Sequence, residues 1–333
     1  MRRRLALFPL CLLLLLCGGC GDPQEEGDLP LLILRYADNQ PEDYPTTAAA
    51  AYFAQLVEER TQGKIRVRLY CNGELGNENQ VLEQVQFGGI DMARVSVSTF
   101  AEPYPKIELL LLPFLYDDAG HMWRVLDGPI GEEFLISARQ AGVVGLSWFD
   151  AGARSFYARE PIGGLEDLRG LTIRVQESAF MSRMVELLGA TPVQIPYNDV
   201  YSALRTGKID GAENNWPSYA FTGHYQAARY CLQDEHSRLP EMQIMSTVAL
   251  DKIAGIDEDY VTIIRQCARE CALYERELWR AQDADSERLV REHGCVVTQL
   301  TSAQREAFRR AVEPMYQEYP PEEQALIRRI RES

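Results

Sequence analysis

Two arginines lie where strands predicted from the sequence meet loops, and both could bind a carboxylate. Arg174 lies near the carboxyl end of the apolar stretch 171–175, and Arg154 follows a predicted strand that ends near Phe149. An arginine in an apolar strand is costly unless an anion pairs with it. Its planar guanidinium can donate two parallel hydrogen bonds to one carboxylate. The two residues therefore predict a carboxylate site, and a structural salt bridge or an exposed loop charge is the alternative for each.

The sequence contains no arrangement of residues typical of a catalytic centre. It has four histidines, and the HExxH, GxSxG, GxGxxG and GxxxxGK[ST] motifs are absent. Carboxylates are numerous, but in an acidic chain most of them belong to a solvated surface. No cysteine stands in a nucleophile signature. The sequence predicts that the protein is not an enzyme, and it indicates neither a cofactor nor a metal site.

Composition narrows the remaining classes of protein. A chain of 333 residues with 46% hydrophobic and 25% charged content predicts about two globular domains. Its aromatic residues and aliphatic runs exclude a disordered protein, and a single long apolar run excludes a polytopic membrane protein. Acidic residues outnumber basic ones by 49 to 34, giving a net charge of −15. This charge disfavours nucleic acid as a partner, and it means that any anion site must be a local basic cavity.

The N-terminus predicts an export signal. Three arginines follow Met1, and residues 5–16 form an apolar stretch that is too short to span a bilayer comfortably, which takes about 20 residues. Small residues precede Cys20, as in a bacterial lipobox. We therefore expect residues 1–19 to be a lipoprotein signal peptide, Cys20 to be lipidated and residues 20–29 to be a tether. A plain signal peptide cleaved near Gly21 is the alternative, and both place the protein outside the cytoplasm.

Five cysteines lie downstream of the export segment, and they do not predict a disulfide framework. Their odd number leaves at least one unpaired. Cys267 and Cys271 are four residues apart in a strongly helical stretch, which places both on one helix face. The CxxC spacing of structural zinc sites is absent. We expect these two residues to be buried as small hydrophobic side chains.

Apolar periodicity predicts two α/β units that would position the arginines. The first unit alternates strands and helices in the pattern of a parallel sheet, at 31–36, 47–60, 64–70, 77–87 and 90–97. The second has strands and helices at 143–148, 171–175, 178–188, 191–195 and 198–204. We also expect a strand at 241–250 and helices at 257–292, 302–316 and 322–330. Such sheets bind ligands at the carboxyl ends of their strands, so the pattern suggests a two-lobed binding protein, although enzymes share this architecture.

A series of short motifs resembles the solute receptors of tripartite ATP-independent periplasmic (TRAP) transporters, the DctP family. Each motif alone is weak, but their order and spacing are specific and extend over nearly the whole mature chain. They include Asn72-Gly73-Glu74-Leu75-Gly76, Gly88-Gly89-Ile90-Asp91-Met92, Leu112-Pro113-Phe114-Leu115, Leu165-Glu166-Asp167-Leu168-Arg169-Gly170-Leu171, Leu188-Gly189-Ala190-Thr191-Pro192 and Ile209-Asp210-Gly211-Ala212-Glu213-Asn214.

The resemblance implies a two-lobed α/β fold whose lobes are joined by crossing strands and one long helix. We expect residues 30–151 with 240–279 to form domain I, and residues 152–239 with 280–333 to form domain II. It also implies an extracytoplasmic receptor that delivers a small-molecule carboxylate to membrane permease subunits. A ligand-binding sensory lipoprotein is the alternative.

The resemblance assigns further residues to the ligand pocket. Arg174 matches the arginine that grips the ligand carboxylate, and Arg154 matches a second pocket arginine. Asn39, Glu78 and Asn214 match other pocket positions. Tyr197 lies where the family often has a pocket aromatic, and a packing role at the entrance of a helix is its alternative.

The stretch 210–219 is similar to receptors for sugar acids, including uronates. Sugar hydroxyls need donors and acceptors, which Asn39, Glu42, Glu78, Gln194, Asn215 and His236 could supply, and Trp216 could stack on a pyranose face. A C4-dicarboxylate needs cations at both ends, and the sequence offers no third good arginine candidate. We therefore expect a hexuronate such as glucuronate or galacturonate, with a C4-dicarboxylate or another organic acid as the alternative.

Overall fold

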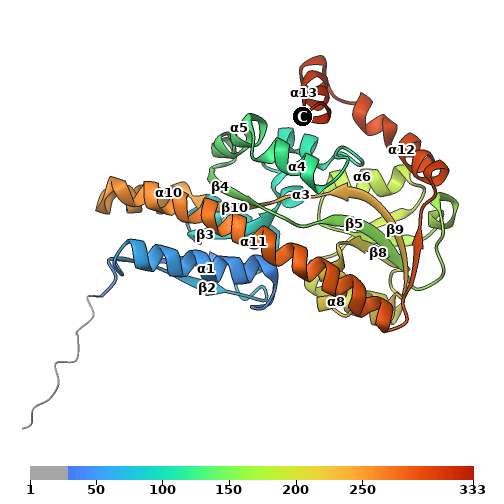
Figure 1. Ribbon diagram of the computed structural model, residues 1–333, viewed down its shortest axis with the longest axis horizontal. Helices are drawn as coiled ribbons and strands as arrows, with labels where there is room; N and C mark the ends of the chain where they lie inside the picture. The colour runs from blue at the N-terminus through green and yellow to red at the C-terminus, as the bar shows by residue number, and fades with distance from the viewer. Residues whose placement is uncertain (1–28) are drawn as a thin grey trace, which may run out of the picture.

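The computed structural model describes residues 29–333 and contains two sheets in a mixed α/β fold (Figure 1). The predicted signal peptide, Cys20 and most of the tether lie outside the described residues. One sheet has five strands in the order β2-β1-β3-β10-β4, and the other has six in the order β11-β9-β5-β8-β6-β7. We call the parts built on them the first and the second lobe.

The first lobe begins as the sequence predicts, with strands that alternate with helices. Its strands are β1 (Leu32–Ala37), β2 (Ile65–Tyr70), β3 (Met92–Ser96), β4 (Val143–Phe149) and β10 (Glu241–Ser246). β1 is parallel to β2 and β3, and β10 is antiparallel to its neighbours β3 and β4. The helices of this part are α1 (Pro45–Arg60), α2 (Glu78–Gln86), α3 (Val97–Phe100), η1 (Pro105–Leu111), α4 (Ala119–Leu126), α5 (Pro129–Ser137), η2 (Ala138–Ala141) and α10 (Thr247–Ile256).

The second lobe mixes parallel and antiparallel pairs. Its strands are β5 (Ala153–Ala158), β6 (Thr172–Val175), β7 (Thr191–Gln194), β8 (Gly211–Asn214), β9 (Tyr230–Arg238) and β11 (Val296–Gln299). β5 is antiparallel to β8 and β9, whereas β6 is parallel to β7 and β8. The remaining helices are η3 (Leu165–Leu168), α6 (Ala179–Leu187), η4 (Tyr197–Asp199), α7 (Val200–Thr206), α8 (Trp216–Phe221), α9 (His224–Ala227), α12 (Ser302–Gln317) and α13 (Pro321–Arg331).

Two chain crossings and one long helix join the lobes. The chain passes from β4 to β5 and returns from β9 to β10, and α11 (Glu258–Glu292) runs alongside both lobes (Figure 1). The first crossing is fixed to α11, because the Asp150 amide donates to Glu275 Oε2 at 2.8 Å. Gly152 in this crossing has φ of +61°, and a Cβ there would lie 2.9 Å from Trp279 Nε1. Glycine is therefore required where the crossing bends against the helix.

The core continues across both lobes. The face of α11 that packs inward includes Ile264, Cys267, Ala268, Cys271 and Val290, spaced as one side of a helix. Cys267 and Cys271 are fully buried, as predicted, and the five described cysteines are all free. The last helix, α13, reaches back to α4 in the first lobe, where His121 Nε2 lies 2.7 Å from the Ile330 carbonyl oxygen.

The strand predicted at 241–250 ends at Ser246 in the structure, so the prediction is wrong for residues 247–250. The hydroxyl of Ser246 accepts a hydrogen bond from the Val248 amide and caps α10, so helix replaces strand from Thr247 onward. Strands β5, β8, β9 and β11 were not expected from the sequence. β8 is only four residues long, and β9 carries polar residues that hide its alternation.

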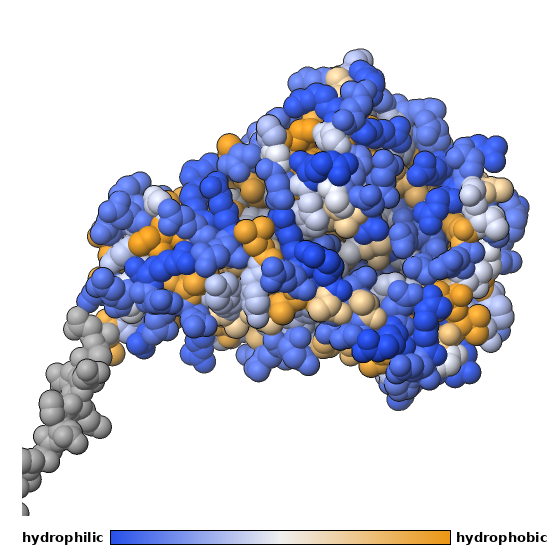
Figure 2. Space-filling model, viewed as in Figure 1, coloured by the Kyte–Doolittle hydropathy of each residue, from blue (hydrophilic) through white to orange (hydrophobic). Residues whose placement is uncertain are grey.

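The molecular surface is mostly hydrophilic on the face shown in Figure 2, with apolar residues in small scattered groups. Within residues 29–333, no helix combines the length and apolar character needed to cross a bilayer.

Candidate ligand-binding site

A cavity of about 290 Å³ lies between the lobes and is lined by residues of both. Its volume is at the lower end of the range for small-molecule sites. Seven of the eleven residues predicted to bind ligand line it, namely Asn39, Glu78, Arg154, Arg174, Tyr197, Asn214 and Asn215. That these seven residues contact a ligand stays a prediction.

Strand register brings the two predicted arginines to one wall of this cavity. Arg174 on β6 pairs with Ala212 on β8, and β8 runs antiparallel to β5, which carries Arg154 near its start. The carboxyl ends of β6 and β8 and the amino end of β5 therefore meet at one edge of the sheet. Both arginines are almost fully buried, at 2% and 3% exposure.

Arg174 has hydrogen-bonding capacity left over. A guanidinium carries five N–H groups, and among residues 29–333 Arg174 donates only from Nε, to the Ile195 carbonyl oxygen at 2.9 Å. Burial lowers its pKa, the positive charge of Arg154 adds to this, and Glu213 opposes it. Arg174 thus combines a desolvated positive charge with four N–H groups that can donate hydrogen bonds to an anion.

Arg154 is held by the protein itself. Its Nε and Nη2 donate to the two carboxylate oxygens of Glu213 at 2.5 and 2.8 Å, and Nη2 also donates to the Glu213 carbonyl oxygen. Nη1 donates to Asn214 Oδ1 at 2.8 Å. Within the part of the chain that the structure describes, one N–H of Arg154 is left without a partner. Arg154 therefore lines the cavity and also forms a structural salt bridge with Glu213, the alternative that the sequence left open.

His236, also predicted to bind ligand, does not line the cavity and lies against this ion pair. Its Nδ1 lies 2.9 Å from Asp234 Oδ2, and its Nε2 lies 3.5 Å from Glu213 Oε2. Burial alone would lower the pKa of His236, but Asp234 and Glu213 raise it to about 9. Burial alone would likewise raise the pKa of Glu213, but Arg154 and His236 lower it to about 2. The charged histidine therefore fixes Glu213, which in turn fixes Arg154.

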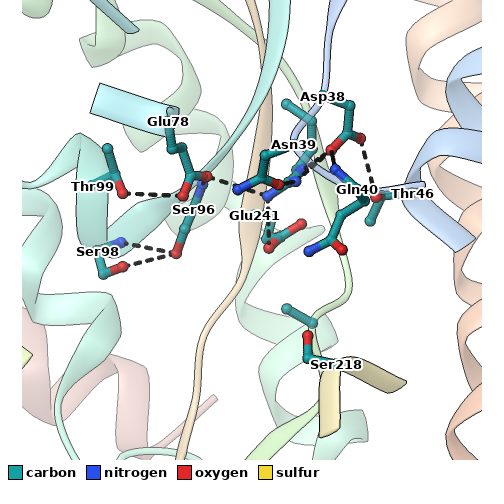
Figure 3. A network of polar contacts seen from close by, with 12 residues as sticks. Asp38, Asn39, Gln40, Thr46, Glu78, Ser96, Ser98, Thr99, Ser218 and Glu241 are labelled. Carbon is teal, nitrogen blue, oxygen red and sulfur yellow. Dashed lines mark hydrogen bonds and ion pairs between the residues drawn. The ribbon is translucent and has the colours of Figure 1, made fainter. Parts of the chain in front are cut away.

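The opposite wall is built around a third arginine, Arg94 on β3. Its five N–H groups are all occupied: two by Asp38, one by Asn39, and one each by Glu78 at 3.2 Å and Glu241 at 3.1 Å. Figure 3 shows these carboxylates and Asn39 arriving from different segments of the first lobe. Arg94 therefore has no donor left for a ligand.

The acidic residues of this wall are themselves held in place. Asp38 follows β1 and accepts from the Gln40 amide at 3.0 Å and from the Thr46 hydroxyl at 3.2 Å. Glu78 opens α2 and accepts from the Ser96 amide at 2.5 Å and from the Thr99 hydroxyl at 3.3 Å. The first-lobe wall is thus a rigid group of acceptors.

Two side-chain hydrogen bonds join the lobes next to residues that line the cavity. Ser98 of the first lobe donates to Gln176 Oε1 of the second at 2.8 Å. The hydroxyl oxygens of Tyr44 and Ser218 lie 2.9 Å apart. Tyr197 lines the cavity from the second lobe, and burial raises the pKa of its phenol, which keeps the hydroxyl neutral and able to donate.

Three further predicted residues do not line the cavity. Glu42 is exposed. Gln194 pairs with Val175 while Val193 pairs with Arg174, and side chains alternate along a strand, so Gln194 lies on the sheet face opposite to Arg174. Its amide donates instead to Ser182 at 3.0 Å.

Trp216 is the third of these residues, and its predicted stacking on a sugar is not supported. It is the first residue of α8 and packs with Tyr219 in the apolar core of the second lobe. The preceding residue, Asn215, does line the cavity, but its Oδ1 caps α8 by accepting from the Ser218 amide at 2.8 Å. The start of α8 thus presents Asn215 to the cavity and turns Trp216 inward.

Sequence reasoning missed several cavity residues, and one of them carried a clear signal. Arg94 was missed as a cavity residue, although it lies in the buried strand β3 just as Arg174 lies in β6. It is not a third carboxylate anchor, because its five N–H groups are occupied within the protein. Gln40, Gln176, Ser218 and Glu241 were also missed, because each is an ordinary polar residue in the sequence.

No metal site is indicated within residues 29–333, where His, Cys, Asp and Glu form no group of three or more that could hold an ion. Glu78 and Glu241 of the cavity lining are engaged by Arg94, and the charges of Arg94 and Arg154 are themselves neutralised by carboxylates. This arrangement is suited to bind one anionic group and several neutral polar groups.

Comparisons with known proteins agree with this geometry. A family model described as bacterial extracellular solute-binding protein, family 7 (DctP) matches residues 36–322. A solute-binding protein of Chromohalobacter salexigens is 31% identical over 297 residues, covering 88% of this chain and 87% of its relative.

Two solved structures show the same fold. A TRAP periplasmic solute-binding protein from Xanthobacter autotrophicus with bound β-D-galacturonate is 39% identical, with a TM-score of 0.86 over 90% of this chain and 99% of that one. Another from C. salexigens with bound D-glucuronate is 32% identical, with a TM-score of 0.85 and the same coverage.

Proposed function

Because the chain belongs to the DctP family of bacterial extracellular solute-binding proteins, we propose that it is the receptor of a TRAP transporter for a hexuronate or a closely related sugar acid. The ligand carboxylate binds Arg174, and its hydroxyls face the first-lobe wall. The receptor releases the ligand, chemically unchanged, to membrane permease subunits.

The distribution of unoccupied arginine donors carries this proposal. Arg174 has four such N–H groups, Arg154 has one and Arg94 has none. The cavity can therefore neutralise one carboxylate, at the second-lobe wall. A second carboxylate of a C4-dicarboxylate would lie against Glu78 without a free cation, which is repulsive.

Hydroxyl groups fit the first-lobe wall better than a carboxylate does. Glu78 offers carboxylate oxygens, and a hydroxyl that donates to a carboxylate forms a strong hydrogen bond. Gln40 Oε1 is a buried acceptor with no hydrogen-bond partner among residues 29–333. The solved relatives with bound galacturonate and glucuronate support the same class of ligand.

We also propose that Cys20 carries a lipid anchor and that the domains divide at the crossings, with residues 30–151 and 240–279 in domain I and residues 152–239 and 280–333 in domain II. The sequence before residue 29 supports the first proposal, and the sheet membership of β4, β5, β9 and β10 supports the second. Mass spectrometry of the mature N-terminus tests the anchor.

A thermal-shift screen tests the ligand. Galacturonate and glucuronate should raise the melting temperature, because a ligand at 100 times its Kd stabilises the folded state by about 2.7 kcal/mol. Succinate and malate should not, since a site built for hydroxyls rejects a ligand that lacks them by as much as about 10⁴-fold. Equal shifts with succinate and with every uronate would contradict the sugar-acid proposal and leave the receptor family unchanged.

A further inference from the structure

Glu241 stands apart from the other carboxylates of the cavity. It begins β10, directly after the second crossing, and its side chain is only 12% exposed. Its Oε1 accepts from Arg94 Nη1 at 3.1 Å, whereas Oε2 is buried and has no hydrogen-bond partner among residues 29–333. Figure 3 shows Glu241 beside Asn39 and opposite Ser218. A buried carboxylate oxygen without a partner is costly in its ionised form.

The charges around Glu241 also disfavour its ionised form. Three carboxylates, those of Asp38, Glu78 and Glu241, share the single positive charge of Arg94. Asp38 and Glu78 each have further donors, from Thr46 and from the Ser96 amide and Thr99. Among residues 29–333, Glu241 has no donor beyond Arg94, so it is the member of the three that takes up a proton most easily.

A sugar hydroxyl both donates and accepts hydrogen bonds, so the first-lobe wall must supply donors as well as acceptors. Arg94 supplies none, since its five N–H groups are occupied, and the side-chain amides of Asn39 and Gln40 supply some. We propose that Glu241 binds the ligand as a neutral carboxylic acid, donating from Oε2 to a hydroxyl or ring oxygen at the end of the sugar acid opposite its carboxylate. This proposal rests on the proposed sugar-acid function and adds a hydrogen-bond donor at the end of the cavity opposite Arg174.

The electrostatic surroundings support this assignment. Burial is the main cause that raises the pKa of Glu241 to about 8, and Glu78 and Asp38 add to the rise against the opposing charges of Arg94 and Arg154. Tyr44, which precedes α1, and Glu275 on α11 also interact electrostatically with Glu241. Ligand binding should therefore weaken as the pH rises through about 8.

Calorimetric titration of the full protein with D-galacturonate and D-glucuronate between pH 6.5 and pH 9 tests the proposal. The Kd should increase by about tenfold over this range, since only the protonated form donates. At pH 8, titrations in buffers of different ionisation enthalpy should reveal uptake of about half a proton per ligand bound.

Two variants identify the titrating group. Glu241→Gln keeps a neutral donor, so its Kd at pH 6.5 should stay within about threefold of wild type and should change by less than about threefold up to pH 9. Glu78→Gln is the matched control, because it removes a negative charge from the same Arg94 nitrogen and leaves Glu241 in place. It should move the midpoint of the pH dependence to lower pH.

Each contrary result has a distinct meaning. A wild-type Kd that is constant from pH 6.5 to pH 9 would overturn the proposal. A fall in affinity that persists unchanged in Glu241→Gln would also overturn it, and would assign the titration to another group such as His236. Failure of both uronates to bind at pH 6.5 would overturn the proposed function itself, and this proposal with it.

Discussion

The two walls of the cavity each present a buried arginine, and they differ in how its charge is neutralised. On the first-lobe wall, Arg94 donates all five N–H groups to Asp38, Asn39, Glu78 and Glu241. On the second-lobe wall, Arg174 donates one N–H to a backbone carbonyl. Burial is the same for both, at 3% and 2% exposure. The comparison indicates that unoccupied N–H donors, and not the burial of a charge, distinguish an arginine that can bind an anion.

Removing the two arginines should therefore affect different properties. Arg94→Met leaves three carboxylates without their cation, and breaking a buried ion pair costs about 3–5 kcal/mol. Arg174→Met removes a buried charge that lacks an ionic partner in the absence of ligand, so it should change the free energy of unfolding by less than about 1 kcal/mol. Urea unfolding of both variants without ligand measures the difference. Equal destabilisation by the two substitutions would contradict the comparison.

Ligand affinity should show the reverse pattern. Arg174→Ala should weaken uronate binding by about 30- to 4,000-fold, because truncating one partner of a buried charge pair costs about 2–5 kcal/mol. Arg174→Lys should also weaken it, since a point charge cannot replace the planar fork. Calorimetry checks both, with circular dichroism as the control for folding. An Arg174→Ala variant that binds within about threefold of wild type would refute the assignment.

The second-lobe wall has its own pH dependence through His236. Its pKa is about 9 in the folded protein, above the value of about 6.5 in an unfolded chain. The stability that its charge contributes is therefore fully present below pH 6.5 and is lost as the pH rises through about 9. Urea unfolding at pH 6, 7.5 and 9.5 should show this fall in wild type and a smaller one in His236→Gln. Parallel profiles would remove His236 from the support of Glu213.

The smallest effects are expected for predicted residues that lie outside the cavity. Glu42→Gln and Gln194→Ala should leave the Kd within about twofold of wild type, because neither side chain reaches the ligand. Trp216→Phe should lower the free energy of unfolding by about 1 kcal/mol, as expected for a smaller core side chain, with little change in affinity. A tenfold loss of affinity in Trp216→Phe would restore its predicted stacking role.

The sequence predicted the parts of the fold that strong periodicity marks. The alternating strands and helices of the first lobe and the long helix α11 lie within a few residues of their expected bounds. Short strands such as β8 were missed, because four residues between a turn and a capped helix carry too little pattern. The strand predicted at 241–250 was longer than β10, because an apolar run does not distinguish a strand from the helix that follows it.

The site was predictable only as far as single residues allow. Arg174 was found because an arginine in an apolar strand implies a partner, and the same reasoning applies to Arg94. What separates them is the set of neighbours that tertiary contacts supply, from segments as distant in sequence as Asp38 and Glu241. Likewise, His236 has the right chemistry for a ligand contact, but the fold places it behind Glu213.

A crystal structure of the protein with galacturonate tests the central claim most directly. We expect both carboxylate oxygens at about 2.7–2.9 Å from the terminal nitrogens of Arg174. The hydroxyls at the other end of the sugar should lie against Asn39, Glu78 and Glu241. A ligand bound in the reverse orientation, with its carboxylate against Arg94, would contradict the claim that the two walls divide the binding of charge and of hydroxyls between them.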